Sequence, residues 1–172
     1  NKRNKDIEIT STNMQLKVEF GLDKRKSSYY IVKRKNEVVI DTSYLGFEFK
    51  NAKALKENLK VLNTTTSTFN ETWQMSWGEQ EEVVNNYNEL KIDLEEQEKP
   101  NRRFSVVFKV YNDGVGFRYE FPKQKGLTEV LITEENTEFN LTEDYKTFWI
   151  PGDWDSYEHL YSTTPLSKIE TA

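Results

Sequence analysis

The sequence is rich in residues that favour extended backbone and almost devoid of alanine. Val, Ile, Thr, Phe, Tyr and Trp together contribute 59 of the 172 residues, whereas Ala contributes three. β-Branched and aromatic side chains pack well on a pleated sheet surface, and alanine is the strongest helix former. The mean hydropathy of −0.83 alone would raise the question of disorder, but an aromatic content of 13% argues against it. The composition therefore predicts a twisted β protein with long polar turns.

Apolar residues alternate with polar ones through many short segments. Leu16, Val18 and Phe20 fall on one side of such a segment and charged residues on the other, which predicts a half-buried strand. About a dozen such strands, with turn signals at intervals of roughly 8–12 residues, predict an antiparallel β-sandwich with little helix.

Two turn signals lie between apolar segments and predict hairpins. Lys35-Asn36 separates the first pair of segments, and Asn112-Asp113-Gly114 separates the second. Asn, Asp and Gly tolerate the backbone conformations that tight hairpin turns require, and Lys-Asn is a weaker turn signal than Asn-Gly.

Three segments depart from the simple alternation. Residues 52–60 place Leu55 and Leu59 at helical spacing and predict one short helix. Residues 63–69 are nearly all Thr and Ser, which suits an exposed or edge strand. Residues 69–79 combine two Trp and two Glu near a Gly without regular alternation, which favours a structured loop.

Charge and residue usage exclude several classes of function. The net charge of −5 argues against a nucleic-acid-binding surface, and no apolar run approaches the roughly 20 residues needed to span a bilayer. The absence of Cys removes disulfides, thiolate metal sites and cysteine nucleophiles. A single histidine, His159, leaves no paired-His metal site, and nothing resembling a nucleophile elbow accompanies it.

The densest group of hard oxygen ligands lies near the C-terminal end. Asp153, Asp155 and Glu158 could ligate a cation such as Ca²⁺, which prefers oxygen donors. The spacing does not match an EF-hand, and one short loop rarely fills the six to eight positions around Ca²⁺. A solvated acidic loop is the alternative interpretation.

Four tryptophans raise the question of carbohydrate binding, because flat apolar sugar faces stack on aromatic rings. They are Trp73, Trp77, Trp149 and Trp154. The alternative is that they pack in the core of the β-sandwich.

Several phrases, read in order, resemble one family of proteins. They are Leu45-Gly46-Phe47-Glu48-Phe49, Phe69-Asn70-Glu71-Thr72-Trp73, Trp77-Gly78-Glu79, Asn86-Tyr87-Asn88-Glu89-Leu90, Asn112-Asp113-Gly114-Val115-Gly116-Phe117-Arg118-Tyr119-Glu120-Phe121-Pro122 and Phe148-Trp149-Ile150-Pro151-Gly152-Asp153-Trp154-Asp155. The sequence resembles the N-terminal domain of glycoside hydrolase family 97, which includes α-glucosidases and α-galactosidases of Bacteroides type. Two departures from the family pattern are Met75-Ser76, where a Pro is common, and Asn86, where a His is common.

The resemblance implies a β-supersandwich of the galactose-mutarotase-like class, followed in the intact enzyme by a catalytic (β/α)₈ barrel. In such enzymes a calcium ion lies in the active site, and the N-terminal domain supplies one Glu ligand after the Pro-Gly-Asp-aromatic-Asp phrase. That ligand maps onto Glu158, whereas Asp153 and Asp155 are expected to shape the loop. The catalytic carboxylates belong to the barrel, so no catalytic residue is expected in this chain.

The same resemblance sets the expected organisation. Residues 1–13 are expected to be a flexible N-terminal segment, residues 14–160 the β-sandwich, and residues 161–172 the start of a connection to the barrel. The expected location is periplasmic or secreted, with the leader not present in this chain.

The leading hypothesis is therefore an N-terminal domain of a family 97 α-glycosidase. It would supply Glu158 to calcium, form part of the pocket for an α-linked oligosaccharide and be inactive as an isolated fragment. The alternatives are a free-standing carbohydrate-binding β-sandwich and a purely structural or interaction domain.

Overall fold

The computed structural model describes residues 7–79, 81–124, 127, 129–152 and 159–170. The chain divides into two compact units, one ending at Asn140 and the other beginning at Leu141.

Strands dominate the described residues. They are β1 (Ile7–Thr10), β2 (Leu16–Leu22), β3 (Ser28–Arg34), β4 (Glu37–Tyr44), β5 (Phe47–Phe49), β6 (Leu59–Gln74), β7 (Glu82–Glu96), β8 (Arg103–Tyr111), β9 (Val115–Glu120), β10 (Ile132–Glu135), β11 (Asn140–Leu141), β12 (Lys146–Trp149) and β13 (Ser162–Pro165). The helix that the structure describes is a single 3₁₀ turn, Leu166–Lys168, and no helix within the described ranges is long and apolar enough to cross a membrane.

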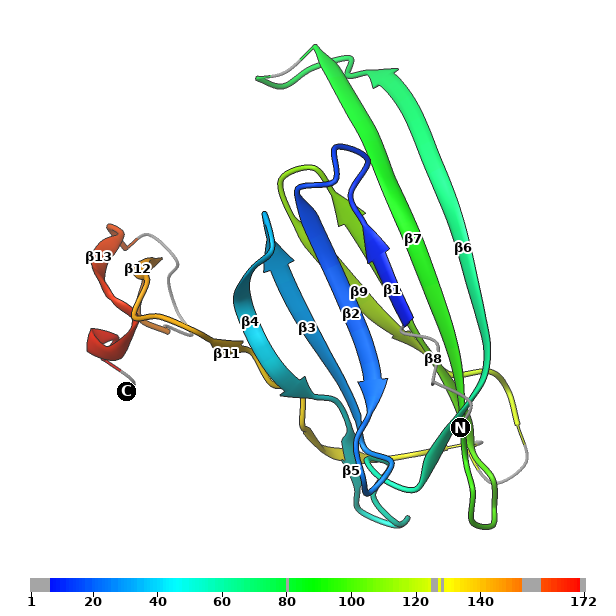
Figure 1. Ribbon diagram of the computed structural model, residues 1–172. Coiled ribbons are helices and arrows are strands. Elements are labelled where there is room, and N and C mark those ends of the chain that lie inside the picture. The colour runs from blue at the N-terminus through cyan, green and yellow to red at the C-terminus, as the bar shows by residue number, and fades with distance from the viewer. Residues whose placement is uncertain (1–6, 80, 125–126, 128, 153–158, 171–172) are drawn as a thin grey trace. The chain divides into compact units, whose positions relative to one another are not determined.

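Two antiparallel sheets form the layers of the first unit (Figure 1). One has the strand order β1-β2-β3-β4-β11 and the other the order β6-β7-β8-β9. The core lies between them, where the Phe108 ring of the second sheet meets the rings of Phe20 and Tyr30 of the first at 6.4 and 5.8 Å between centroids. The predicted all-β sandwich with little helix is confirmed.

Smaller strand pairs complete the two units. β5 pairs with β10 in the first unit, and β12 pairs with β13 in the second. β1 lies within residues 1–13, where it pairs with β2 along its whole length and buries Ile9.

Both predicted hairpins are present. β3 and β4 are joined at Lys35 and Asn36, which both have positive φ, as a tight hairpin turn with two left-handed residues requires. β8 and β9 are joined by a turn in which the Tyr111 N–H donates to the Gly114 carbonyl at 2.8 Å.

The predicted helix over residues 52–60 is wrong. The backbone of Leu55 instead exchanges two hydrogen bonds with Phe47, and the N–H groups of Asn58 and Leu59 donate to carbonyls of the β2–β3 connection. Leu55 and Leu59 are fully buried, so their spacing reflects two contacts with the sandwich core and not one face of a helix.

The predicted loop over residues 69–79 is also corrected. β6 continues to Gln74 and stays in register with β7, so that Trp73 lies opposite Val83. The sequence shows no period of two here because both faces of the two strands are largely exposed, and neither face needs to be apolar throughout. The exposed strand expected over residues 63–69 is confirmed as part of β6, which lies at the edge of its sheet.

Candidate functional site

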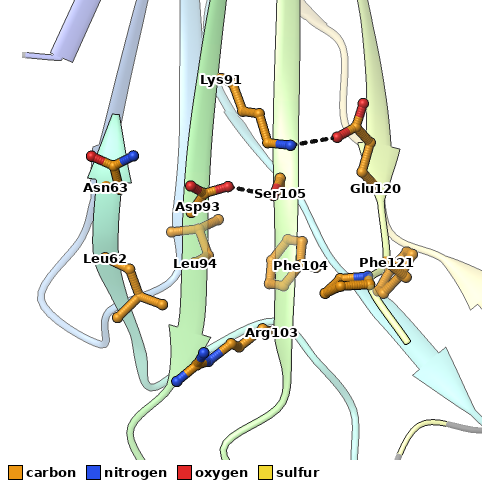
Figure 2. A pocket seen from close by; sticks show the side chains of 11 residues that line it. Leu62, Asn63, Lys91, Asp93, Leu94, Arg103, Phe104, Ser105, Glu120 and Phe121 are labelled. Carbon is orange, nitrogen blue, oxygen red and sulfur yellow. Dashed lines mark hydrogen bonds and ion pairs between the residues drawn. The ribbon is translucent and has the colours of Figure 1, made fainter. Parts of the chain in front are cut away.

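A pocket of about 600 Å³ opens on the four-stranded sheet of the first unit (Figure 2). Residues from all four strands line it, together with the segment that follows β9. They are Leu62, Asn63, Lys91, Asp93, Leu94, Arg103, Phe104, Ser105, Glu120, Phe121 and Pro122.

The alternation of side chains along β7 explains the polar floor of the pocket. Leu90, Ile92 and Leu94 are buried in the core between the sheets. Lys91 and Asp93 stand between them in the sequence and therefore project from the opposite face of the sheet. Ser105 takes the same position on β8, because Phe104 and Val106 on either side of it belong to the core.

Side-chain hydrogen bonds from β7 to β8, from β7 across β8 to β9, and within β9 hold the floor. The Ser105 hydroxyl donates to Asp93 Oδ1 at 2.6 Å, and Lys91 Nζ donates to Glu120 Oε2 at 2.8 Å. Arg118 donates to the other oxygen of Glu120 through Nε and Nη2, at 2.9 and 2.7 Å. Figure 2 shows Lys91 and Asp93 extended toward their partners across the sheet.

Apolar side chains form part of the wall around this polar floor. Leu62 and Phe121 are both well exposed, on opposite sides of the pocket. A ligand seated here would meet hydrogen-bonding groups below and apolar surface at the sides.

Ion pairing favours the charged forms of Glu120 and Lys91 at the floor and of Glu95 nearby, as their pKa shifts show. Hydrogen bonds from Lys91 and Arg118 lower the pKa of Glu120, and the hydrogen bond to Glu120 raises the pKa of Lys91. Hydrogen bonds from Lys60 and Arg103 lower the pKa of Glu95 in the same way. A glycosidase general acid needs a raised carboxyl pKa, so these groups are suited to binding and not to proton donation.

The arrangement can bind a neutral ligand that is rich in hydroxyl groups. Asp93 and Glu120 accept hydrogen bonds and Lys91 donates them, while the apolar wall can cover the C–H face of a sugar ring. Within the described ranges, no group of three or more His, Asp or Glu side chains could hold a metal ion.

The predicted metal ligand, Glu158, lies outside the described residues, as do Asp153, Asp155 and Trp154. His159 is described and is exposed. The metal-site prediction at Glu158 therefore stays a prediction.

The other tryptophans fall in different places. Trp149 is on β12 in the second unit, where its Nε1 donates to Thr164 Oγ1 at 3.0 Å. Trp73 lies on β6, and Trp77 lies in the connection between β6 and β7, where it is highly exposed. None of these three is in the sandwich core.

The pocket residues were not identified from the sequence. The sequence of β7 could have indicated two of them. Lys91 and Asp93 alternate with core residues along the strand, so their side chains must face away from the core. What the sequence could not supply was the register that places Ser105 opposite Asp93.

Comparison with known proteins identifies the family. The family described as Glycosyl-hydrolase 97 N-terminal matches residues 9–172, nearly the whole chain. The chain belongs to this family. The resemblance drawn from the six sequence phrases is thereby confirmed.

Solved structures similar to this family 97 N-terminal domain are enzymes. A variant of a Glycoside Hydrolase Family 97 enzyme from Pseudoalteromonas sp. strain K8, in complex with panose, is 36% identical, with a TM-score of 0.86 over 94% of this chain and 25% of that one. An acarbose complex of the enzyme from the same strain is 35% identical, with a TM-score of 0.85 over 92% and 24%.

A more distant similar structure is a beta-arabinopyranosidase. It is 25% identical, with a TM-score of 0.77 over 92% of this chain and 26% of that one. The family 97 N-terminal domain therefore spans about a quarter of the length of the enzymes that it matches.

Proposed function

We propose that this chain serves as the N-terminal β-sandwich of an α-glycosidase, in which a separate catalytic portion hydrolyses α-glucosides or α-galactosides. The observation that carries the proposal is the family match over residues 9–172, combined with a span of one quarter of the matched enzymes. The panose and acarbose complexes of the Pseudoalteromonas enzyme favour a glucoside, whereas the similarity to a beta-arabinopyranosidase leaves room for another pyranoside.

The chain would be inactive without that catalytic portion. The carboxyl groups with shifted pKa values, Glu95, Glu120 and Asp144, are all shifted downward, so none of these three is a general acid for glycoside cleavage. Assays with p-nitrophenyl α-glucoside and α-galactoside, on this chain and on the longer polypeptide that contains it, test the proposal. We expect turnover from the longer polypeptide alone, and robust hydrolysis by the 172-residue chain would overturn inactivity as a fragment.

Glu158 is the residue proposed to reach calcium. The donor chemistry fits, since Glu158 and its acidic neighbours offer the oxygen ligands that Ca²⁺ prefers. One glutamate supplies at most two of the six to eight ligand positions around Ca²⁺, and the described residues hold no group of three or more carboxylates that could bind a metal. The proposal therefore takes the other ligands from the catalytic portion. When bound, the ion would orient the sugar and polarise it as a Lewis acid.

Glu158→Gln in the longer polypeptide tests this role. We expect weaker calcium binding by calorimetry and lower activity that added calcium partly restores. Glu143→Gln, at another exposed glutamate, is the matched control and should change neither measurement. An unchanged calcium affinity in Glu158→Gln would remove the assigned role.

A second candidate function is carbohydrate binding by this chain alone, and the pocket of the four-stranded sheet specifically favours it. Its polar floor and apolar wall suit a neutral sugar. Titration of the chain with panose, followed by amide chemical shifts, should move the resonances of residues around Asp93 in a saturable way. Asp93→Ala should abolish the shifts and the turn variant Asp113→Ala should not, whereas a spectrum unchanged by panose argues against this function.

A further inference from the structure

The far end of the β6–β7 pair has no neighbouring strand (Figure 1). β7 pairs with β8 only from Tyr87 to Glu95, whereas its pairing with β6 continues to Glu82. Residues 70–74 and 82–86 therefore form a two-stranded ribbon that extends beyond the sheet, and together with the connection between them we call this segment the distal hairpin. Such ribbons are only marginally stable in water when nothing covers them.

The distal hairpin carries large apolar side chains in contact with solvent. Trp77 is 87% exposed, Val84 62%, Met75 45% and Trp73 42%. Trp73 lies directly opposite Val83, and Phe69 at the base of the hairpin stacks on Tyr87 at 4.8 Å between ring centroids. Because residues two apart share a face of a strand, Phe69, Glu71 and Trp73 lie on one face of β6, which therefore combines aromatic side chains with a carboxylate.

The charge of the distal hairpin has one sign. It contains Glu71, Glu79, Glu81 and Glu82 and no Lys, Arg or His, which leaves 25 acidic against 24 basic residues in the rest of the chain. Nearly all of the net charge of −5 is therefore concentrated on this one ribbon. Among the ion pairs between described residues, none involves these four glutamates.

The combination of exposed apolar side chains and negative charge restricts which surfaces can bind the distal hairpin. A second copy of the chain, joined symmetrically through the same surface, would bring two sets of four glutamates together, and like charges at an interface cost free energy. Nucleic acid and anionic lipid are disfavoured for the same reason. The complementary surface is one with an apolar groove and a rim of Lys or Arg.

We propose that the distal hairpin docks on the catalytic portion of the same polypeptide, against an apolar groove with a basic rim. This inference rests on the proposed function, because the matched enzymes are single chains about four times as long as this one. A surface on the same polypeptide is present at a high effective concentration, so a modest interface is sufficient to hold the hairpin in place. The exposed tryptophans supply the contact area, and the glutamates set the orientation.

Hydrogen–deuterium exchange over residues 70–86 tests the docking directly. We expect amide exchange in the distal hairpin to be at least about 10-fold slower in the longer polypeptide than in the 172-residue chain. Equal exchange in the two would overturn the proposal. Glycosidase activity of the longer polypeptide is measured in parallel, so a failure of the proposed function is seen separately from a failure to dock.

Variants separate the two features of the surface. In the longer polypeptide, Trp77→Ser and the pair Glu81→Lys with Glu82→Lys should each restore fast exchange in the hairpin, whereas Glu37→Lys, at the exposed β3–β4 turn, should not. If the Glu81→Lys and Glu82→Lys pair leaves the slow amide exchange of the hairpin unchanged, the proposed basic rim of the groove is wrong. Protection that appears in the 172-residue chain only at high protein concentration would identify a second copy as the occupant and overturn the proposal.

Discussion

β7 pairs with β6 in one register from Glu82 to Asp93, yet its two halves have opposite environments. Near β8 the side chains of Leu90 and Ile92 are sealed between the sheets, whereas in the distal hairpin Val84 and Trp77 face solvent. Backbone pairing is continuous from Asn63 to Gln74, so the difference between the two halves of β7 comes from what covers each face. It follows that the proximal half contributes to the stability of the sandwich and that the distal half is available for recognition.

The largest expected effect on stability comes from the buried ion pair at the end of β7 near β8. Arg102 donates to both carboxylate oxygens of Glu96 at 2.6 Å, and both residues are almost fully buried. Arg102→Met would leave Glu96 as an uncompensated buried charge, which should lower the free energy of unfolding by about 3–5 kcal/mol. Urea denaturation measures the loss.

The exposed ion pair of Lys53 with Glu98 provides the control for that substitution. Lys53→Met should leave the denaturation midpoint nearly unchanged, because exposed ion pairs contribute little. Equal effects of the two substitutions would show that burial does not distinguish the pairs.

The next effect compares the two halves of β7 directly. Ile92→Ala removes a fully buried side chain and should cost about 2–5 kcal/mol, including the cavity it leaves. Val84→Ala, in the distal hairpin, should stay within about 0.5 kcal/mol of the wild type. A large loss from Val84→Ala in the 172-residue chain would mean that the distal hairpin is already covered.

A smaller effect uses one substitution at two sites. Val106→Thr places a hydroxyl in the core of the sandwich without a partner and should cost about 1–3 kcal/mol. Val84→Thr keeps the same shape at the exposed site, so its thermal midpoint should match that of the wild type. Similar midpoints for the two variants would contradict the assignment of Val106 to the core.

The smallest effect is on the pH dependence of stability. The pKa of Glu120 is lowered in the folded chain by hydrogen bonds from Lys91 and Arg118. Its ionised form therefore stabilises the fold above the unfolded pKa of about 4.3, and this contribution is lost as pH falls through the lower folded pKa. Glu120→Gln should reduce the loss of stability between pH 6 and pH 3 by less than about 1 kcal/mol, measured by urea unfolding.

A matched removal of charge checks that last effect. Glu82→Gln removes one negative charge from the distal hairpin, where no ion pair among the described residues involves it. A pH profile altered equally by both substitutions would point to net charge and not to the Lys91–Glu120 pair.

The sequence predicted most of the fold because one face of most strands is buried. Val18 and Phe20 revealed their strand through alternation, and the tight turn at Lys35 and Asn36 revealed its hairpin. The alternation of apolar and polar residues did not predict the structure where a strand has no single buried face or where a core residue lies outside a strand. The end of β6 has two exposed faces, and Leu55 reaches the core from an irregular segment held by backbone pairing to Phe47.

The candidate site was less predictable than the fold. Asp93 and Ser105 are 12 positions apart and meet only through the register of β7 and β8, which turn geometry and packing decide together. Glu158 was reached through resemblance to the family and remains a prediction, because it lies outside the described residues.

The position of β6 at the edge of its sheet bears on the solubility of the chain. Its 16 residues offer one row of backbone N–H and C=O groups to a passing molecule, without a Pro and with Lys60 and Glu71 as its charged residues. A long edge of this kind is a template for intermolecular strand pairing and aggregation. The four glutamates of the distal hairpin, at the far end of β6, oppose such pairing because they repel the same glutamates of another copy. Salt weakens this protection, because charges more than about 10 Å apart are screened at 0.1 M ionic strength.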